Sequence, residues 1–141
     1  LIGWKTVKDA SNYHKINFKL KQNASRFEEG SQNLIGVHAL RASIRLLRSI
    51  GIERIEQWNL HLTDLLLKGL KGQGGRILNS TMPQDRSSII SFTTGNKAKD
   101  RALVNHLIKN KIIVSLRADG IRLSPHLYNT PAETAKFFRV F

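Results

Sequence analysis

The sequence has 141 residues, 40% hydrophobic and 23% charged, with a formal net charge of +13. This length and composition predict a soluble globular chain with a real core and exclude an intrinsically disordered one. The absence of cysteine excludes disulfides, cysteine nucleophiles and thiolate metal sites.

The positive charge has two interpretations. It can indicate a nucleic-acid, membrane or acidic partner, or it can belong to one piece of a larger protein whose remainder is acidic. The chain begins with Leu1 instead of methionine and reaches Phe141 while its pattern is still helical. We therefore expect a fragment. No apolar run approaches the roughly 20 residues that span a bilayer, and no signal pattern is present. We expect a cytoplasmic protein without membrane contact.

The first 25 residues are expected to be largely irregular and basic. Residues 16–20 alternate between apolar and polar side chains, which indicates a possible short strand. We interpret this part of the chain as a strap that crosses another body.

A first helix should begin near residue 32, with Ser31 or Asn33 as its N-cap, and Gly51 should end it. Its apolar residues recur at helical spacing and predict a core-facing stripe: Leu34, Val37, Leu40, Ile44 and Leu47. Arginines recur on another face at 41, 45 and 48. A solvated or partner-facing surface is favoured over a phosphate-binding track.

A second helix is predicted from about Glu53 to Leu70, and the glycines at 72, 74 and 75 should end it. Its predicted buried stripe is Ile55, Trp58, Leu62, Leu65 and Leu66. The three glycines are too scattered for a dinucleotide fingerprint, which needs a preceding strand and a following helix.

The pattern then changes to strands. Strands are expected at 75–80, 87–94, 112–117 and 121–124, with a helix over 99–109 and a tight turn at 118–120. Thr130, Pro131 and Glu133 have the spacing of an N-cap, a first helical residue and a capping box, so a last helix should begin there. The order predicts an α+β fold in which helices cover a small, mainly antiparallel sheet.

Arg122 interrupts the apolar run of the last strand. Burying an arginine is costly unless it meets an anion, and its planar fork suits a carboxylate or phosphate. Alternatively, Arg122 ends the strand and points into water. Arg117 lies on the other side of the turn, so both guanidinium groups can approach one end of the sheet. The five histidines lack metal-ligand spacing, and no serine lies in a nucleophile elbow.

Two motifs resemble those of the class V aminotransferases. Residues 26–31, Arg-Phe-Glu-Glu-Gly-Ser, are similar to a signature of that family, and residues 121–131 are similar to its closing segment. They occur in the family's order, and the resemblance covers essentially the whole chain. The family comprises fold-type I pyridoxal-phosphate enzymes, including cysteine desulfurases, selenocysteine lyases, isopenicillin N epimerase-like proteins and kynureninases.

The resemblance implies a C-terminal small domain over residues 32–141, with residues 1–31 as a strap and linker from the cofactor-binding domain. It implies that Arg122 binds the α-carboxylate of an amino-acid substrate and that Arg117 is a second arginine at the edge of the active site. Ser31 corresponds to a hydroxyl residue that contacts the phosphate of pyridoxal 5'-phosphate in the partner subunit of a homodimer.

The chain also departs from the family. Close desulfurases carry a nucleophilic cysteine between the positions of the two arginines, whereas this chain has no cysteine. The resemblance therefore argues against desulfuration through a persulfide. The family's Schiff-base lysine lies upstream of the matched motifs, and no lysine here is assigned to that role, so the isolated chain is expected to be inactive. The alternative function is a basic nucleic-acid-binding module, whose affinity would fall steeply with salt.

Overall fold

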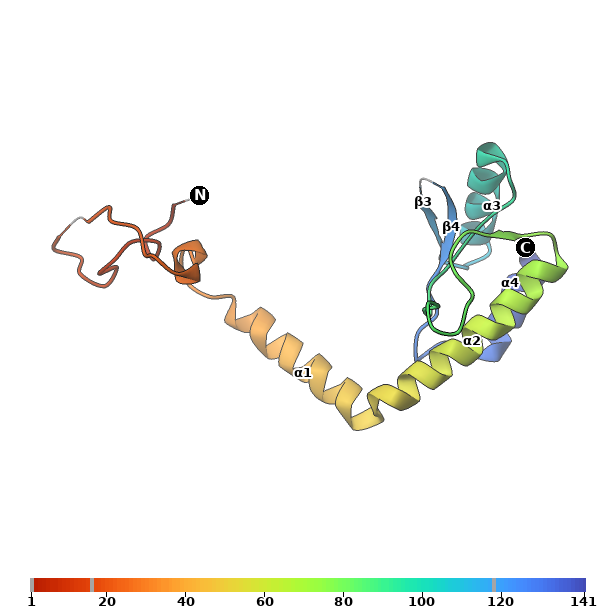
Figure 1. The fold of residues 1–141 in the computed structure, drawn as a ribbon, viewed down its shortest axis with the longest axis horizontal. Coiled ribbons are helices and arrows are strands. Elements are labelled where there is room, and N and C mark those ends of the chain that lie inside the picture. Colours follow the sequence, from red (N-terminus) through yellow and green to blue (C-terminus); the bar gives the residue numbers. More distant parts are fainter. Residues whose placement is uncertain (1, 16, 118) are drawn as a thin grey trace. The chain divides into compact units, whose positions relative to one another are not determined.

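The computed structural model describes residues 2–15, 17–117 and 119–141, and it divides into two compact units, Leu1–Leu47 and Arg48–Phe141. Their helices and strands follow the predicted order (Figure 1). The elements are η1 (Ala24–Phe27), α1 (Leu34–Ile50), α2 (Ile52–Gly72), β1 (Arg76–Ile77), β2 (Ile90–Thr93), α3 (Lys97–Lys109), β3 (Ser115–Arg117), β4 (Gly120–Leu123) and α4 (Pro131–Val140). Every described helix is too short or too polar to cross a bilayer.

The segment before α1 is irregular, as predicted, and folds back on itself. The amide of Lys21 donates to the carbonyl of Thr6, and that of Lys8 donates to the carbonyl of Lys19. The strand predicted over 16–20 is reduced to one bridge, between Val7 and Leu20. Ile16 lies outside the described residues. Because a strand needs a continuous ladder of partners, alternation alone does not produce one.

Helix α1 has the predicted bounds, and Asn33 is its N-cap, since its side-chain oxygen accepts the amide of Gly36 at 2.9 Å. The predicted burial of its apolar stripe is wrong for this chain. Leu34 is 62% exposed and Leu40 is 61% exposed, and no residue of the helix is buried. Periodicity places apolar side chains on one face, but the described residues supply no surface that covers that face.

Gly51 separates α1 from α2. Its φ of 97° lies in a region that glycine adopts readily. Of the predicted stripe, Ile55, Leu62 and Leu66 are buried. Trp58 is not. It is 38% exposed, and its indole N–H donates to the carbonyl of Asn129 at 3.1 Å. An indole keeps its polar edge paired in this way.

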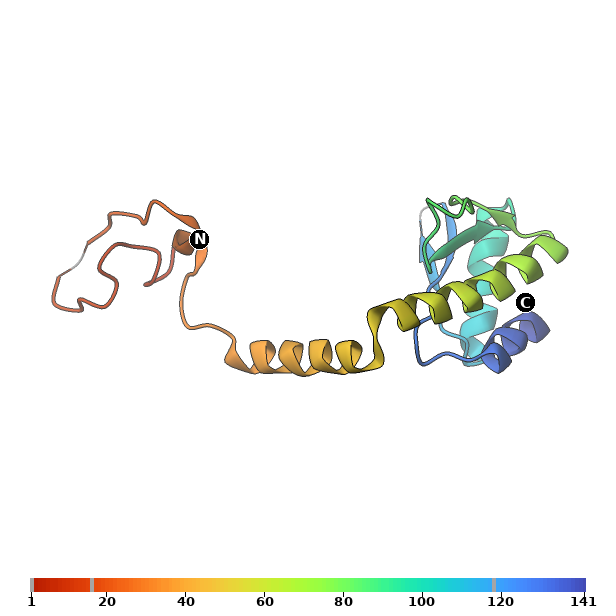
Figure 2. The ribbon, with the colours of Figure 1, turned by 60° about the horizontal axis from the view of Figure 1, so that its bottom comes forward.

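The four strands form an antiparallel sheet in the order β1-β2-β4-β3. Its apolar face carries the paired residues Phe92 and Ile121, both fully buried. Helices α2, α3 and α4 pack on that face, as Figure 2 shows for the second unit. The core they share consists of Leu66, Leu67, Leu70, Ile90, Phe92, Val104, Leu107, Ile121, Leu123 and Phe137. The predicted α+β class and the antiparallel sheet are confirmed.

Three strands, β1, β2 and β3, are shorter than predicted. At β1 and β3, local hydrogen bonds compete with the ladder. Beyond β1, the side-chain oxygen of Asn79 accepts the amide of Ser91 at 2.7 Å and takes the place of a backbone partner. Before β3, the amide of Ile112 still donates to the carbonyl of Leu107, at the end of α3. The strand therefore cannot begin at residue 112.

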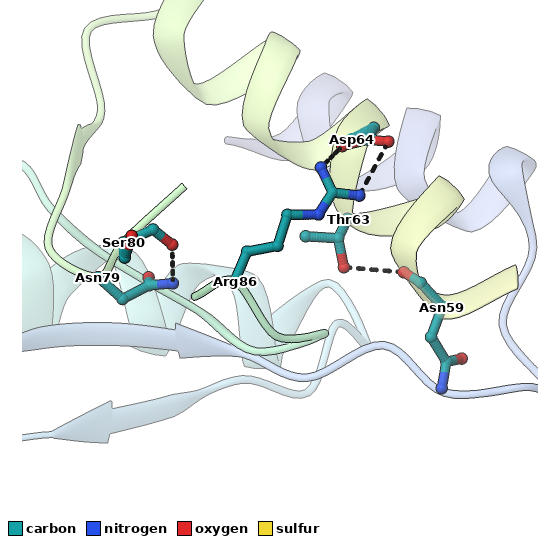
Figure 3. A network of polar contacts seen from close by, with 6 residues as sticks. All are labelled: Asn59, Thr63, Asp64, Asn79, Ser80 and Arg86. Atoms are coloured by element: carbon teal, nitrogen blue, oxygen red, sulfur yellow. Dashed lines mark hydrogen bonds and ion pairs between the residues drawn. The ribbon is translucent and has the colours of Figure 1, made fainter. Parts of the chain in front are cut away.

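The connection from β1 to β2 is fastened to α2. Arg86 donates two hydrogen bonds to the carboxylate of Asp64, at 2.6 and 3.2 Å (Figure 3). This pairing raises the pKa of Arg86 above its ordinary value, chiefly through its hydrogen bonds to Asp64. The bond from the Asn79 side chain to the carbonyl of Ser80, at 3.2 Å, holds the start of the same connection.

Helix α4 begins as its sequence predicts. The hydroxyl of Thr130 accepts the amide of Glu133, and the carboxylate of Glu133 accepts the amide of Thr130 at 2.8 Å. Pro131 occupies the first turn, where its missing N–H costs nothing. The hydrogen bonds from the Thr130 amide and the Asn129 side chain hold the pKa of Glu133 below its ordinary value.

Candidate functional site

The strand register places Arg117 and Arg122 on the same face of the sheet. Arg122 pairs with Ser115, and Arg117 pairs with Gly120. Residues paired across antiparallel strands point to one face, as do residues two apart on a strand. The two arginines are therefore diagonal neighbours, with Cα atoms about 7–8 Å apart. Gly120, opposite Arg117, adds no side chain between them. Ala118, in the turn, lies outside the described residues.

Arg122 occupies a central strand on the face opposite the core. Its lateral neighbours are Ser91 of β2 and Ser115 of β3, so this part of the face is polar. The side chain is partly buried, and its Nε makes no hydrogen bond with the described residues. A buried donor without a partner costs about 1–3 kcal/mol. A bound anion that reached Nε would remove this cost, and a carboxylate has the geometry to pair with Nε and a terminal nitrogen together.

Two more buried polar atoms lack partners within the described residues: Oδ1 of Asn59 and Nδ1 of His126. Neither residue was predicted to be buried from the sequence. A polar residue within the buried stripe of α2 was a usable signal for Asn59, which is 7% exposed. His126 lies in the connection from β4 to α4, where the sequence pattern gave no indication of burial.

Asn129 organises that connection. Its side-chain oxygen accepts the amide of His126 at 2.9 Å, and its side-chain nitrogen donates to Glu133 at 3.3 Å. Its carbonyl accepts the indole of Trp58. The ring of Tyr128 stacks on His126 at 5.3 Å and is otherwise exposed. The turn that follows the Arg122 strand is thus tied to α2 and to the start of α4.

Arg117 also lines a cavity of about 470 Å³ together with Lys97 and Arg101 of α3. Asp100 is the one carboxylate in that lining. Burial raises the pKa of Asp100, but hydrogen bonds from the Thr93 hydroxyl and from the amide and hydroxyl of Thr94 outweigh it, so the pKa lies below its ordinary value. The cavity therefore combines three exposed cations with one anion that is already hydrogen-bonded.

Ser31 belongs to the first unit, whereas the two arginines belong to the second. Ser31 is exposed, and its hydroxyl makes no hydrogen bond with the described residues. Because Asn33 caps α1, the hydroxyl of Ser31 is available to donate to an external acceptor such as a phosphate. Among the described residues, no three histidine or carboxylate side chains gather as a metal site.

Comparisons with known proteins identify one family. The family model "Aminotransferase class-V" matches residues 1–139. An uncharacterised aminotransferase of Schizosaccharomyces pombe is 32% identical over 91% of this chain and 32% of its own length. The kynureninase of Bacillus mycoides is 26% identical over 99% of this chain and 34% of its own length. The chain spans only 28–34% of the length of the first curated relatives that it matches.

Solved structures agree with these matches. The apo cysteine desulfurase of Thermococcus onnurineus is 25% identical with a TM-score of 0.81, over 99% of this chain and 37% of that one. A variant of C-DES, solved with glycine covalently linked to its PLP cofactor, is 22% identical with a TM-score of 0.77. That match covers 98% of this chain and 36% of C-DES, and it supports the fold alone.

Proposed function

Because this chain belongs to the class-V aminotransferase family, we propose that it is the C-terminal small domain of a pyridoxal-phosphate-dependent enzyme that acts on an amino acid. The family match and the antiparallel α+β fold support this assignment. We assign residues 32–141 to the small domain and residues 1–31 to the connection with the cofactor-binding domain. The enzyme would be of the aminotransferase, lyase or epimerase type.

The observation that carries the proposal is the buried, unpaired Nε of Arg122 on the polar face of the sheet. In this proposal Arg122 binds the α-carboxylate of the substrate through two parallel hydrogen bonds. Its neighbours Ser91 and Ser115 keep the surroundings polar without supplying a competing carboxylate. Arg122 then contributes orientation rather than bond cleavage, because it fixes one end of the substrate while the reacting carbon is elsewhere.

Two further residues complete this chain's part of the site. Arg117, the diagonal neighbour of Arg122, would supply a second positive charge at the site's edge. Ser31 would donate its free hydroxyl to the phosphate of the cofactor, in the partner subunit of a homodimer. A single exposed hydroxyl fits a supporting contact to a phosphate, not a complete phosphate site.

The cofactor, when bound, supplies an electron sink that stabilises negative charge on the substrate carbon. C-DES, which shares the fold, carries PLP. We assign no lysine of this chain to the covalent link with the cofactor. The isolated 141-residue chain should therefore retain no cofactor absorbance band after mixing with pyridoxal phosphate and desalting.

The first test is the kinetics of Arg122→Ala in the full-length enzyme. Loss of a charge-assisted contact of about 1.5–3 kcal/mol should lower kcat/KM by roughly 10- to 150-fold, mainly through a higher KM. Arg122→Lys should recover only part of the loss, because an ammonium group cannot pair with both carboxylate oxygens in plane.

The matched control is Arg76→Ala, which removes an exposed arginine from β1 in the same sheet. Its kcat/KM should stay within about twofold of wild type, since isolated surface charges contribute little. Unchanged kinetics in Arg122→Ala, or an equal loss in both variants, would contradict the assigned role.

A further inference from the structure

The cavity between α3 and the β3–β4 hairpin has a composition that the substrate-binding role of Arg122 does not explain. It has a volume of about 470 Å³ and is lined by Lys97, Asp100, Arg101, Leu116, Arg117 and Gly120. Lys97, Arg101 and Arg117 are all exposed. In the part of the chain that the structure describes, none of the three makes an ion pair, since the recorded pair joins Arg86 and Asp64.

Asp100 does not neutralise these cations by contact. Its oxygens accept hydrogen bonds from the Thr93 hydroxyl at 2.6 Å and from the amide and hydroxyl of Thr94, each at 2.8 Å. The carboxylate is 2% exposed and is directed into the junction between β2 and α3. The outer rim of the cavity therefore presents three positive charges to solvent, which favours a ligand with several carboxylates.

The same cavity adjoins an open sheet edge. β3 is one of the two edge strands in the order β1-β2-β4-β3 and lies next to β4 (Figure 1). Its backbone groups on the side away from β4 have no partner among the described residues. Two apolar side chains mark this edge: Ile113 is 92% exposed and Leu116 is 37% exposed. An open edge with unpaired backbone groups can accept another strand through main-chain hydrogen bonds.

We propose that the β3 edge binds an extended acidic segment of a partner protein, whose carboxylates meet Lys97, Arg101 and Arg117. Backbone pairing with β3 would provide affinity, and one apolar side chain of the segment would cover Ile113. The three cations would provide selection for acidic sequences and faster association. This surface shares Arg117 with the proposed substrate site, but it requires neither Arg122 nor the cofactor.

The test is fluorescence anisotropy of a labelled peptide of about ten alternating glutamate and valine residues, titrated with the full-length protein. Affinity should fall when salt rises from about 50 to about 300 mM. The double variant Lys97→Glu/Arg101→Glu should weaken binding by at least about tenfold, because it reverses two charges at the rim. The control Arg41→Glu/Arg45→Glu makes the same charge change on exposed residues of α1 and should stay within about twofold.

A peptide that is N-methylated at alternate residues keeps its charge but cannot donate along one edge, so it should bind at least about tenfold more weakly. Arg122→Ala should leave peptide binding unchanged even if it abolishes catalysis. Equal losses in the two double variants would indicate unspecific attraction and overturn the proposal. So would undiminished binding of the methylated peptide, or tighter binding of single-stranded DNA that is lost in Lys97→Glu/Arg101→Glu.

Discussion

Arg122 lies between Ser91 and Ser115 in the middle of a four-stranded sheet, and its Nε is buried without a partner among the described residues. A buried donor that stays without a hydrogen-bond partner costs about 1–3 kcal/mol. Occupation by a carboxylate would return that free energy at the moment of binding. In the proposed role, the same contact would also select the substrate.

The sequence predicted correctly that Arg122 lies in a strand after a tight turn, but it did not predict which residues surround its side chain. An apolar run, a tight turn and a capped helix were sufficient to predict the β3–β4 hairpin. The pairing of Ser91 with Arg122 could not be predicted, because Ser91 lies 31 positions earlier in the sequence and the two residues meet only in the folded sheet. Asn59 and His126 were missed for the same reason, since burial of a polar atom depends on what packs against it.

Asp100 should make stability depend on pH. Its folded pKa lies below its ordinary value, so its contribution to stability is present above the unfolded pKa and is lost as pH falls through the folded pKa. The Tm of the wild-type protein should therefore decrease as pH falls below about 4. Asp100→Asn should lower Tm at pH 7 and remove this part of the pH dependence.

A thermal melt at several pH values, for both proteins, measures this effect. The control is Asp85→Asn, which makes the same change at an exposed side chain without a hydrogen bond among the described residues. Its melting profile should follow that of wild type. Parallel profiles for Asp100→Asn and wild type would show that the Thr93–Thr94–Asp100 cluster does not act in this way.

At the scale of the elements, α2 and α4 approach each other closely at Gly69. A Cβ at this position would overlap the ring of Phe138, which packs directly on the helix backbone. Gly69→Ala should therefore destabilise the protein by about 1–3 kcal/mol, although alanine is the better helix former. Gly72→Ala, on the same helix, meets no atom within 4 Å and should stabilise it by up to about 1 kcal/mol.

Urea unfolding of both variants distinguishes packing from helix propensity. Opposite signs for the two substitutions are the expected result. If Gly69→Ala were as stable as Gly72→Ala, the close contact between α2 and α4 would not limit the fold.

Elements were predicted correctly where the residues that determine their bounds are close together in the sequence. The start of α4 was predicted correctly, because the Thr130–Glu133 capping box lies within one helical turn. The C-terminal end of β1 and the start of β3 were predicted wrongly. Asn79 replaces a backbone partner of Ser91, and Ile112 remains bound to α3, and neither bond is visible in residue patterns.

At the scale of the whole molecule, the exposed apolar stripe of α1 is the main departure from expectation. Leu40 is 61% exposed and Val37 is 56% exposed. Helical periodicity correctly predicted that these side chains share a face, but it cannot identify the surface that covers them. The chain spans about a third of its relatives' length, and we propose that the cofactor-binding domain of the same protein packs on this face.

This proposal predicts the effect of Leu40→Ser in the full-length enzyme. Loss of a buried leucine side chain should lower the free energy of unfolding by about 2–4 kcal/mol. Ala42→Ser, on the opposite face of α1, should cost less than about 0.5 kcal/mol. Urea unfolding measures both. Equal, small effects would contradict the proposal, and a loss that disappears at higher protein concentration would assign the face to a second copy of the chain.

The proposed contact between Arg122 and the substrate carboxylate is tested by comparing an amino acid with its carboxamide. In the full-length enzyme, the ratio of kcat/KM for the acid over the amide should be large for wild type, because only the acid carries the negative charge. In Arg122→Ala that ratio should fall by roughly 10- to 150-fold. If the preference for the acid survives the substitution undiminished, Arg122 does not bind the carboxylate.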